Sequence, residues 1–529
     1  MSLLSLVIFL PLIGAALVAL VPKRNVAAIR YLALATTLAT FGASLALFFR
    51  FDGSTAAFQF VEELDWAPAW GLAYRVGIDG LSIWMVMLTT FITIIAVWFS
   101  FYVDKRAKEF MVWLLILEMA MIGVFCSLDL LLFYMFFEAT LFPMYFLIAI
   151  WGGKERVYSS IKFILFTFFG SVFMLVGIIV VWNLAKTELG YGTFNLFELQ
   201  RLSSIGRLAT GAAQMWLFAS FALAFAVKVP MFPVHTWLPD AHTEAPTAGS
   251  ILLAAVMLKM GVYGFLRLCL PLFPEASQQA APLLMGLAVV GIIYGAIMAA
   301  VQTDWKRLVA YSSVSHLGFI MIGVFSMTHN GFTGAVLQSI NHGISTGALF
   351  LMVGMIYERT HTRLFADYGG IKKQMPLFAA LFLIVMLSSV GLPSLNGFIG
   401  EFLTMLGAFE SGFAGNVPMW MPVLAGGGVV LAAVYLLWMY QKVFYGPVTN
   451  PENLRLRDIK PWETACCGLL VILIFWFGLY PKTLTAPIEA SLHNTRLQAT
   501  APVGERPVWT TTSDETVLAR AISESQWLR

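Results

Sequence analysis

The sequence predicts an all-α membrane protein that crosses the bilayer about fourteen times and carries a small β-hairpin outside it. Two features of composition support this fold class. Of 529 residues, 59% are hydrophobic and 12% are charged, and the mean hydropathy is +0.82. In addition, apolar runs of about 20 residues, the length that spans the hydrocarbon core as a helix, recur from end to end. We therefore expect most of the chain to lie in lipid.

The individual spans are placed between breaks that are rich in charge, glycine or proline. They lie near 3–21, 31–49, 81–103, 110–126, 128–150, 159–182, 208–238, 247–270, 282–301, 307–325, 332–356, 376–408, 421–441 and 464–480. In the first run the positive charges Lys23, Arg24 and Arg30 follow the apolar residues instead of preceding them. That order is wrong for a cleaved signal peptide and predicts a retained first helix.

Lysine and arginine are distributed unevenly between alternate loops, and cytoplasmic loops are the ones enriched in them. An even number of spans then places both termini on the other side, the periplasmic side of a bacterial inner (plasma) membrane. The rich loops hold Lys23, Arg24, Arg30, Lys105, Arg106, Lys108, Lys154, Arg156, Lys306, Arg307, Arg359, Arg363, Lys372, Lys373, Lys442, Arg455, Arg457 and Lys460. The poor loops hold mainly Arg50, Arg75, Lys186, Arg201 and Arg207.

Two segments outside the spans have their own patterns. Residues Ala57–Val61 and Leu72–Val76 flank Pro68 and Gly71, which predicts a β-hairpin on the membrane surface. After Tyr480 the chain turns polar, and it is either a solvated tail or a segment that docks against a neighbouring subunit. A short amphipathic helix is expected there, capped by Ser513 and carrying Val517, Leu518, Ala521 and Ile522.

Two long spans are interrupted by proline and glycine. The seventh breaks at Lys228–Pro230 and the twelfth at Gly391–Pro393. Such breaks free backbone groups that lipid cannot satisfy but a polar cavity can. Because the breaks are five spans apart, the broken helices run in opposite directions, as in two inverted five-helix repeats. The expected units are 1–109 (helices 1–3 and hairpin), 110–270 (first half-channel, helices 4–8), 271–445 (second half-channel, helices 9–13) and 446–529 (helix 14 and tail).

Charged residues lie inside these spans. Glu138, Lys228, Lys259 and Glu401 fall near the middle or at a break, and Glu118 lies within the fourth span. Each such charge costs at least about 2.5 to 3.5 kcal/mol to insert, so the set needs a compensating role. A Glu–Lys pair that forms and separates can load and release a proton, which favours Glu138 with Lys228 as a switch. The alternative is that buried ion pairs only fix helix packing.

Polar residues in spans ten and eleven extend this set. His316 and His342 lie in adjacent spans, and the four-residue spacing of Gln338, His342 and Thr346 places them on one helix face. They predict a proton or water path from Lys259 through His316 and His342 to Glu401. Other polar residues beside them are Ser312, Ser313, Ser315 and Asn341, whereas Asp129 and Asp304 are interpreted as helix caps.

Several chemistries are excluded by what the sequence contains. Cys126, Cys269, Cys466 and Cys467 lie in apolar segments without the spacing of a zinc, iron–sulfur or CxxC site. The net charge is +3 and no basic patch suggests nucleic acid. We find no GxGxxG unit and no nucleophile constellation. The absence of these motifs favours a chain without a redox centre of its own.

Three long motifs carry a family resemblance: Phe137–Pro143 (FEATLFP), Lys228–Pro246 (KVPMFPVHTWLPDAHTEAP) and Tyr311–Gly318 (YSSVSHLG). In these, and over nearly its whole length, the chain resembles the antiporter-like membrane subunits of respiratory complex I. Within them it is similar to the M branch of NADH-quinone oxidoreductase, the bacterial counterpart of mitochondrial chain 4. A glutamate at Glu401, where the L and N branches carry lysine, favours M.

The resemblance implies a mechanism and partners. Glu138, Lys228 and Lys259 fall on the functional glutamate and lysines of the family. Quinone reduction elsewhere in the complex, with FMN and iron–sulfur clusters in partner subunits, would drive proton translocation here. By the same resemblance, this chain itself would hold no cofactor. The neighbours implied are the antiporter-like subunits L and N.

Three other functions remain open from sequence. A subunit of a multisubunit Na⁺/H⁺ antiporter would use the Glu138 and Lys228 pair without a redox partner. A secondary transporter of a small organic solute would place a substrate pocket at the breaks. A membrane scaffold would use the buried charges for packing alone. No all-oxygen cation cage is visible.

Overall fold

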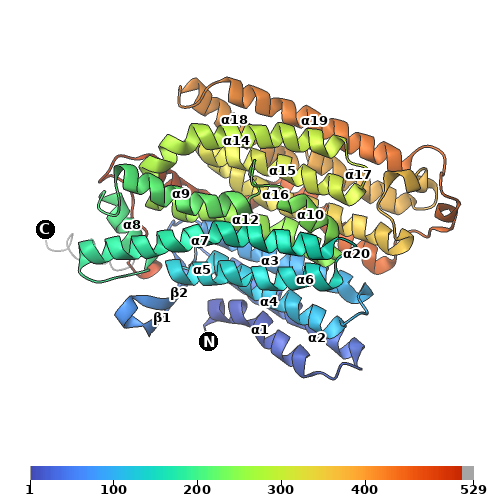
Figure 1. Cartoon of the computed structure of the whole chain (residues 1–529), viewed down its shortest axis with the longest axis horizontal. Coiled ribbons are helices and arrows are strands. Elements are labelled where there is room, and N and C mark those ends of the chain that lie inside the picture. Colours follow the sequence, from blue (N-terminus) through green and yellow to red (C-terminus); the bar gives the residue numbers. More distant parts are fainter. Residues whose placement is uncertain (1, 515–529) are drawn as a thin grey trace.

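The computed structural model describes residues 2–514, and these form a bundle of long, roughly parallel helices (Figure 1). Within the described residues, 13 helical spans are long and apolar enough to cross a membrane. The pair α17 and α18 adds one interrupted crossing. The predicted all-α membrane fold is confirmed.

The crossings follow the predicted order and differ from it only at their ends. They are α1 (Leu3–Leu20), α2 (Val26–Arg50), α3 (Gly80–Phe99), α4 (Ala107–Cys126), α5 (Leu130–Ala139) with α6 (Leu141–Trp151), α7 (Arg156–Leu189), α9 (Gly211–Lys228) with α10 (Trp237–Glu244), α11 (Thr247–Leu252) with α12 (Leu258–Gly264) and α13 (Leu270–Leu272), α14 (Pro274–Ala300), α15 (Trp305–Phe325), α16 (His329–Thr360), α17 (Pro376–Val390) with α18 (Asn396–Phe413), α19 (Trp420–Phe444) and α20 (Pro461–Leu479). The remaining helices are α8 (Leu196–Ser204), α21 (Lys482–Thr485) and α22 (Glu489–Thr500).

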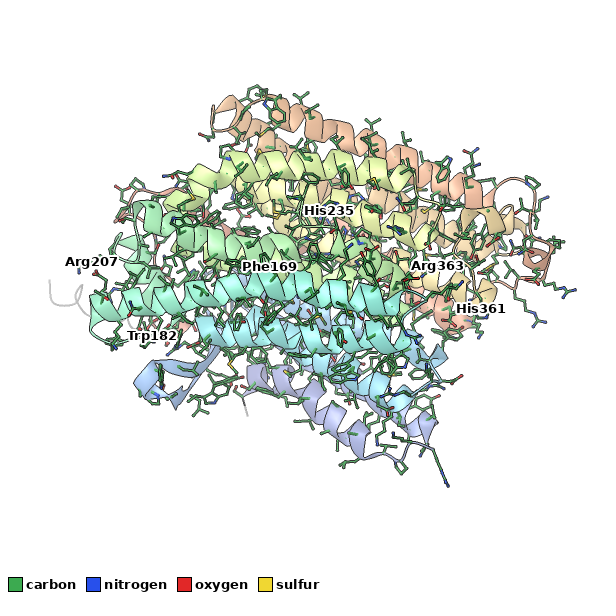
Figure 2. The ribbon with its side chains drawn as sticks, viewed as in Figure 1. Phe169, Trp182, Arg207, His235, His361 and Arg363 are labelled. Carbon is green, nitrogen blue, oxygen red and sulfur yellow. The ribbon has the colours of Figure 1, made fainter. Side chains whose placement is uncertain are left out.

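The bundle has two ends, which we name by their loops. The hairpin side carries β1 (Gln59–Ala67), β2 (Leu72–Ile78) and α8, and lies at the left of Figure 1. The loop side, opposite, carries most of the lysine- and arginine-rich connections. Figure 2 places Trp182 and Arg207 at the hairpin side and His361 and Arg363 at the loop side. Every crossing therefore runs between these two ends.

Polar and apolar side chains are arranged as expected for a protein surrounded by lipid. Large apolar residues are exposed along the outer helices, among them Leu165 and Phe169 of α7 and Val430 of α19. In contrast, α15 and α16 are buried and hold polar residues such as His316 and His342. Because apolar exposure is costly in water and favourable in lipid, the outer face is the membrane-contacting surface.

The predicted β-hairpin is confirmed, with one shift in its first strand. β1 and β2 pair antiparallel, and Gly71 in the turn adopts a positive φ of 68°. The first strand begins at Gln59 and extends to Ala67, later and further than the predicted Ala57–Val61. The reason is that Phe58 pairs with a segment near the C-terminus instead of with β2.

That segment, Arg506–Thr512, is here called the C-terminal strap. Phe58 N donates to Thr510 O over 2.9 Å, and Thr512 N donates to Phe58 O over 3.1 Å. Trp509 is buried. The chain up to Thr512 is thus docked on the hairpin side of its own fold and is not a solvated tail. The expected amphipathic helix carrying Val517, Leu518, Ala521 and Ile522 lies outside the described residues.

Both predicted helix breaks are present. α9 ends at Lys228 and α10 begins at Trp237, and α17 ends at Val390 before α18 begins at Asn396. α9 and α18 lie toward the hairpin side, whereas α10 and α17 lie toward the loop side (Figure 1). The two broken crossings therefore run in opposite directions.

Candidate proton-transfer site

Lys228 is the last residue of the half-helix α9, at the first break. Its side chain is buried, with 1% of the residue exposed. Unwinding after Lys228 frees the carbonyl of Val227, which accepts a hydrogen bond from Trp237 Nε1 over 3.0 Å. The carboxyl end of a helix carries partial negative charge and stabilises a cation there. The break thus creates a place for a lysine ammonium at membrane depth.

The predicted partner of Lys228 is near it but not bonded to it. Lys228 Nζ donates to Thr140 Oγ1 over 3.3 Å and lies 4.9 Å from the centroid of the Phe137 ring. Thr140 and Phe137 flank Glu138 in sequence, and the Lys228 charge acts on the Glu138 carboxylate. Within the described residues the two charges form no ion pair, so the structure holds this predicted pair in a separated arrangement.

Glu138 and Glu118, the two glutamates inside the spans of the expected first half-channel, differ in their surroundings. Glu138 is half-buried, and the polar groups that act on its carboxylate are Ser171 of α7 and Lys228. Its Oε1 has no hydrogen-bond partner among the described residues. Glu118 is fully buried, and neither of its oxygens has a partner there. Glu118 therefore does not pair helices in this structure.

Lys259 lies at the centre of the bundle, in α12, with 0% of the residue exposed. The turn before it, Leu253–Met257, is π-helical. Such a turn leaves carbonyls free of the regular helix pattern, and Lys259 Nζ donates to Ala254 O over 2.5 Å. The same amine lies 2.7 Å from His342 Nδ1. Lysine and histidine are thus in direct contact across two helices.

A second pair lies in the other half. His316 Nδ1 is 2.7 Å from Glu401 Oε1, and Gln338 Nε2 donates to the same oxygen over 3.0 Å. On its other nitrogen, His316 meets the hydroxyl of Tyr435 at 3.4 Å. A histidine bonded to a carboxylate is suited to receive a proton from one side and pass it to the other.

One gap separates the two pairs. The rings of His316 and His342 have centroids 5.9 Å apart, and His342 Nε2 has no partner among the described residues. A cavity of about 10 Å³ lies between them, lined by Gln338, Asn341 and Ser345 as well as both histidines. That volume fits about one water molecule, and the lining is polar enough to hold it.

The second break positions Glu401. Asn396, the first residue of α18, joins the surrounding helices: its Oδ1 accepts from Ser388 Oγ over 2.5 Å, and its O accepts from Asn341 Nδ2 over 2.7 Å. Glu401 lies in the second turn of α18, close to the start of this half-helix. Gly391, at the end of α17, has φ of 83°, and a Cβ there would lie 3.1 Å from Glu401 Oε2.

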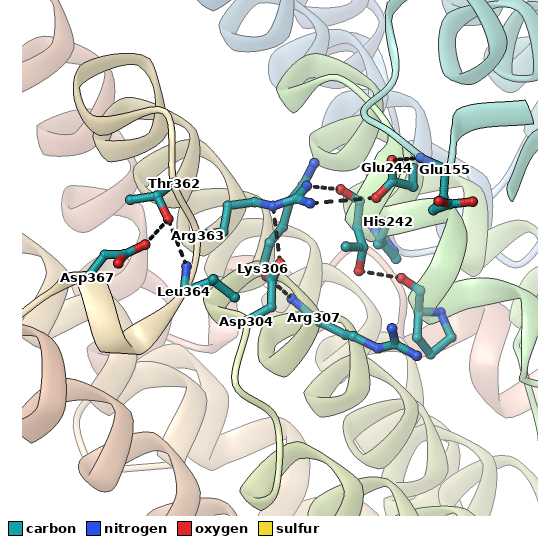
Figure 3. Close-up of polar contacts among 12 residues, drawn as sticks. Glu155, His242, Glu244, Asp304, Lys306, Arg307, Thr362, Arg363, Leu364 and Asp367 are labelled. Carbon is teal, nitrogen blue, oxygen red and sulfur yellow. Dashed lines mark hydrogen bonds and ion pairs between the residues drawn. The ribbon is translucent and has the colours of Figure 1, made fainter.

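A cavity of about 380 Å³ lies at the loop side, and its lining includes Glu244, Lys306 and Arg363. Figure 3 shows Arg363 between Glu244 and Asp304, with Nε 3.1 Å from Asp304 Oδ2 and Nη2 3.6 Å from Glu244 Oε1. Lys306 Nζ donates to Ala245 O over 2.5 Å. The walls of the cavity therefore carry ionisable side chains, and one of them, Glu244, ends the half-helix α10 of the broken seventh crossing.

His242 lies two residues before Glu244, which lines this cavity. It is fully buried, and neither ring nitrogen has a hydrogen-bond partner in the described part of the chain. Its ring stacks on Phe350 with centroids 4.6 Å apart. The charges of Lys306 and Lys259 both act on it. His242 thus lies within electrostatic reach of Lys306, which lines the cavity, and of the central Lys259.

Sequence reasoning named most of these residues but not all their partners. Asp129 and Asp304 are helix caps as predicted, accepting from Leu132 N and Arg307 N respectively. Lys306, Arg363, His242 and Glu244 were not predicted as site residues. Lys306 and Arg363 stand among loop charges, and His242 and Glu244 follow a proline-rich break, so only the fold brings them together. Residues 2–514 hold no group of three or more His, Cys, Asp or Glu placed to bind a metal ion.

The fold and the buried charged residues define the class of protein. Residues 127–424 match the family described as NADH:quinone oxidoreductase/Mrp antiporter, transmembrane. The chain belongs to this family. It is 44% identical to NADH-quinone oxidoreductase subunit M of Rhodobacter capsulatus over 93% of this chain and 96% of the relative. It is 39% identical to NADH-ubiquinone oxidoreductase chain 4 of Arabidopsis thaliana over 93% and 96%. Within the family, the chain therefore falls in the subunit M branch of respiratory complex I.

Comparison with solved structures supports the same family assignment. A chain of the respiratory complex I of Thermus thermophilus, solved with bound NADH, is 32% identical, with a TM-score of 0.84 over 94% of this chain and all of that one. A chain of the Mrp complex of Dietzia sp. DQ12-45-1b has a TM-score of 0.79 at 20% identity over 94% and 99%. The second likeness shows the shared fold alone, so the Na⁺/H⁺ antiporter alternative is the weaker one.

Proposed function

We propose that this chain, as an antiporter-like M subunit of complex I, translocates protons through its two half-channels, residues 110–270 and 271–445. The flanking units are 1–109, with helices 1–3 and the hairpin, and 446–529, with helix 14 and the tail. The loop side faces the cytoplasm and both termini face the periplasm of a bacterial plasma membrane. The driving reaction, with its FMN, iron–sulfur clusters and quinone, belongs to partner subunits, and the neighbouring membrane subunits are L and N. No cofactor is needed in this chain.

The contact between Lys259 and His342 is the observation that carries this proposal. Both side chains are buried and lie 2.7 Å apart, where a proton on Nζ can pass directly to Nδ1. The second contact, between His316 and Glu401, repeats the arrangement one step further on. A packing role needs fully paired charges. Here Lys259 and His342 share one contact, and His342 Nε2 stays free.

The route begins at the loop-side cavity. Protons enter past Glu244 and Lys306 and reach His242, which exchanges them with Lys259. From Lys259 they move to His342, cross the small polar cavity to His316, and arrive at Glu401. Glu401 stands at the amino end of a half-helix that leads toward the hairpin side, so it is the release group.

Lys228 and Glu138 control this route. The helices that carry Lys228 and Lys259, α9 and α12, pack closely at Gly261, where a Cβ would lie 3.1 Å from Lys228 Cβ. When Lys228 moves toward Glu138, its positive charge therefore moves away from Lys259. Lys259 then holds its proton more readily. When Lys228 returns to Thr140, repulsion drives the proton on to His342. Charges brought close in a low-dielectric interior interact strongly enough for this.

The test is NADH-driven proton pumping in membrane vesicles that carry Lys228→Ala or Glu138→Ala, with assembly measured in the same membranes. Lys186→Ala is the matched control because Lys186 is an exposed lysine on α7. We expect assembled Lys228→Ala and Glu138→Ala complexes to lose pumping and coupled oxidation, while Lys186→Ala pumps normally. An assembled Lys228→Ala complex with normal pumping contradicts the proposal. Pumping that requires added Na⁺ identifies a sodium carrier instead.

A further inference from the structure

Arg267 is the largest buried charge that the proposed route does not use. It lies in the π-helical turn Phe265–Cys269, with 1% of the residue exposed. Its position is eight residues after Lys259, with Tyr263 between them at four-residue spacing. Residues four apart lie on one helix face. Arg267 therefore stands between the central lysine and the hairpin side.

A chain of hydroxyl groups leads from this helix face toward the hairpin side. Tyr263 Oη lies 3.1 Å from Ser82 Oγ, and Ser82 Oγ donates to Asp79 Oδ1 over 3.2 Å. Tyr263, Ser82 and Asp79 are all buried. Hydroxyls relay protons, and a carboxylate accepts them. If Arg267 were absent, the series Tyr263, Ser82 and Asp79 would offer protons at Lys259 a path out of the first half-channel toward the hairpin side.

Arg267 blocks this proton path through its hydrogen bonds and its positive charge. Its Nη2 pairs with Asp79 Oδ1, and its Nε donates to Tyr263 Oη over 3.1 Å. Because Arg267 donates to it, Tyr263 turns its own proton toward Phe125 O, 3.0 Å away, and a carbonyl cannot relay it. The guanidinium itself never releases a proton and repels any that approaches.

Aromatic rings keep water away from this ion pair. The guanidinium carbon lies 4.8 Å from the centroid of Phe58 and 5.5 Å from that of Trp509. Phe58 precedes β1, and Trp509 belongs to the C-terminal strap. Gln200 of α8 fixes the strap by accepting from Trp509 N over 3.1 Å. Parts of the chain distant in sequence thus meet over one buried charge, where exclusion of water strengthens its field.

We propose that Arg267 with Asp79, covered by Phe58 and Trp509, is an electrostatic plug. It stops protons held at Lys259 from leaking to the hairpin side, so that they pass sideways to His342. This inference rests on the proposed function, since it takes Lys259 as the proton carrier. It gives the C-terminal strap a role within this chain.

The test is the passive proton leak of vesicles containing the assembled complex, driven by a potassium diffusion potential in the absence of NADH. The double variant Arg267→Gln/Asp79→Asn removes both charges and keeps polar side chains. We expect its leak rate to rise at least about tenfold, as follows when a barrier falls by about 1.4 kcal/mol. Adding Lys259→Ala should return the leak to the wild-type rate. Arg267→Lys, which keeps the cation, should not leak.

The matched control is Arg359→Gln/Glu463→Gln, which removes another largely buried pair, 2.5 Å apart, at the loop side. Its leak should stay at the wild-type rate. An unchanged leak in the assembled Arg267/Asp79 variant overturns the plug, and so does a leak that persists with Lys259→Ala. If the double variant does not assemble, Trp509→Ala serves instead, because it lets water reach the Arg267–Asp79 ion pair. It should give the same Lys259-dependent leak. Normal NADH-driven pumping by Lys259→Ala alone would instead overturn the proposed function.

Discussion

His342 is the residue at which the two halves of the polar network meet. Its Nδ1 contacts Lys259, its ring lies beside His316, and its Nε2 is free to face the small cavity. Asp129 and Asp304 show a different arrangement, since their carboxylates bind helix amides and serve as caps. The position of His342 between Lys259 and the small polar cavity is the one that the proposed transfer requires.

We therefore expect His342→Gln to assemble and to lower NADH-driven proton pumping at least about tenfold, since an amide cannot take up and release a proton as an imidazole does. The measurement is the initial rate of vesicle acidification, normalised to assembled complex. His329→Gln is the control, because His329 is a half-exposed histidine paired with Glu489 at 3.1 Å. Equal pumping by both variants would remove His342 from the route.

The broken crossings are the elements that carry the site. Lys228 ends the half-helix α9, where the helix dipole favours a cation, and Glu401 lies in the second turn of the half-helix α18. The geometry of the second break depends on Gly391, whose φ of 83° is a conformation that other residues adopt at a cost.

We expect Gly391→Ala to destabilise the subunit by about 1 to 2 kcal/mol, the penalty for a left-handed residue with a Cβ, and to push Glu401 Oε2 away from its position. Thermal unfolding of the purified complex and its pumping rate should both fall. Gly427→Ala is the control: nothing lies within 4 Å of a Cβ at this helical position in α19, so stability should stay equal or rise. A Gly391→Ala complex as stable and active as wild type would show that the break tolerates a side chain.

The breaks and the hairpin could be predicted from sequence because their causes are local. Proline and glycine end a helix wherever they stand, and alternating residues around Pro68 and Gly71 specify paired strands. The π-helical turn before Lys259 has no such signal, since Leu253–Met257 reads as an ordinary apolar helix and its shape depends on packing. The pairing of Lys259 with His342, and of Phe58 with the strap, joins residues far apart in sequence. Sequence therefore pointed to the buried charges inside the spans, but not to their contacts and not to the loop-side residues His242, Glu244, Lys306 and Arg363.

At the scale of the whole molecule, the polar interior runs across the bundle while the outer surface is apolar. The residues of the proposed route belong to different crossings, so the proton path that we propose runs sideways between the half-channels; they are Lys228, Lys259, His342, His316 and Glu401. Such a path carries protons across the membrane only if its two ends open on opposite sides. The orientation of the chain thus decides whether entry past Glu244 faces the cytoplasm.

That orientation can be measured by cysteine labelling. The native cysteines Cys126, Cys269, Cys466 and Cys467 are buried, so a membrane-impermeant maleimide should leave the wild-type chain unlabelled. Asp65→Cys lies at an exposed position in the hairpin and Lys373→Cys at one in a lysine-rich loop. Because positive loops stay in the cytoplasm, we expect labelling of Asp65→Cys in spheroplasts and of Lys373→Cys only in inverted vesicles. The reverse pattern would place the loop-side cavity at the periplasm, and the same chain of contacts would then have to run from Glu401 toward Glu244.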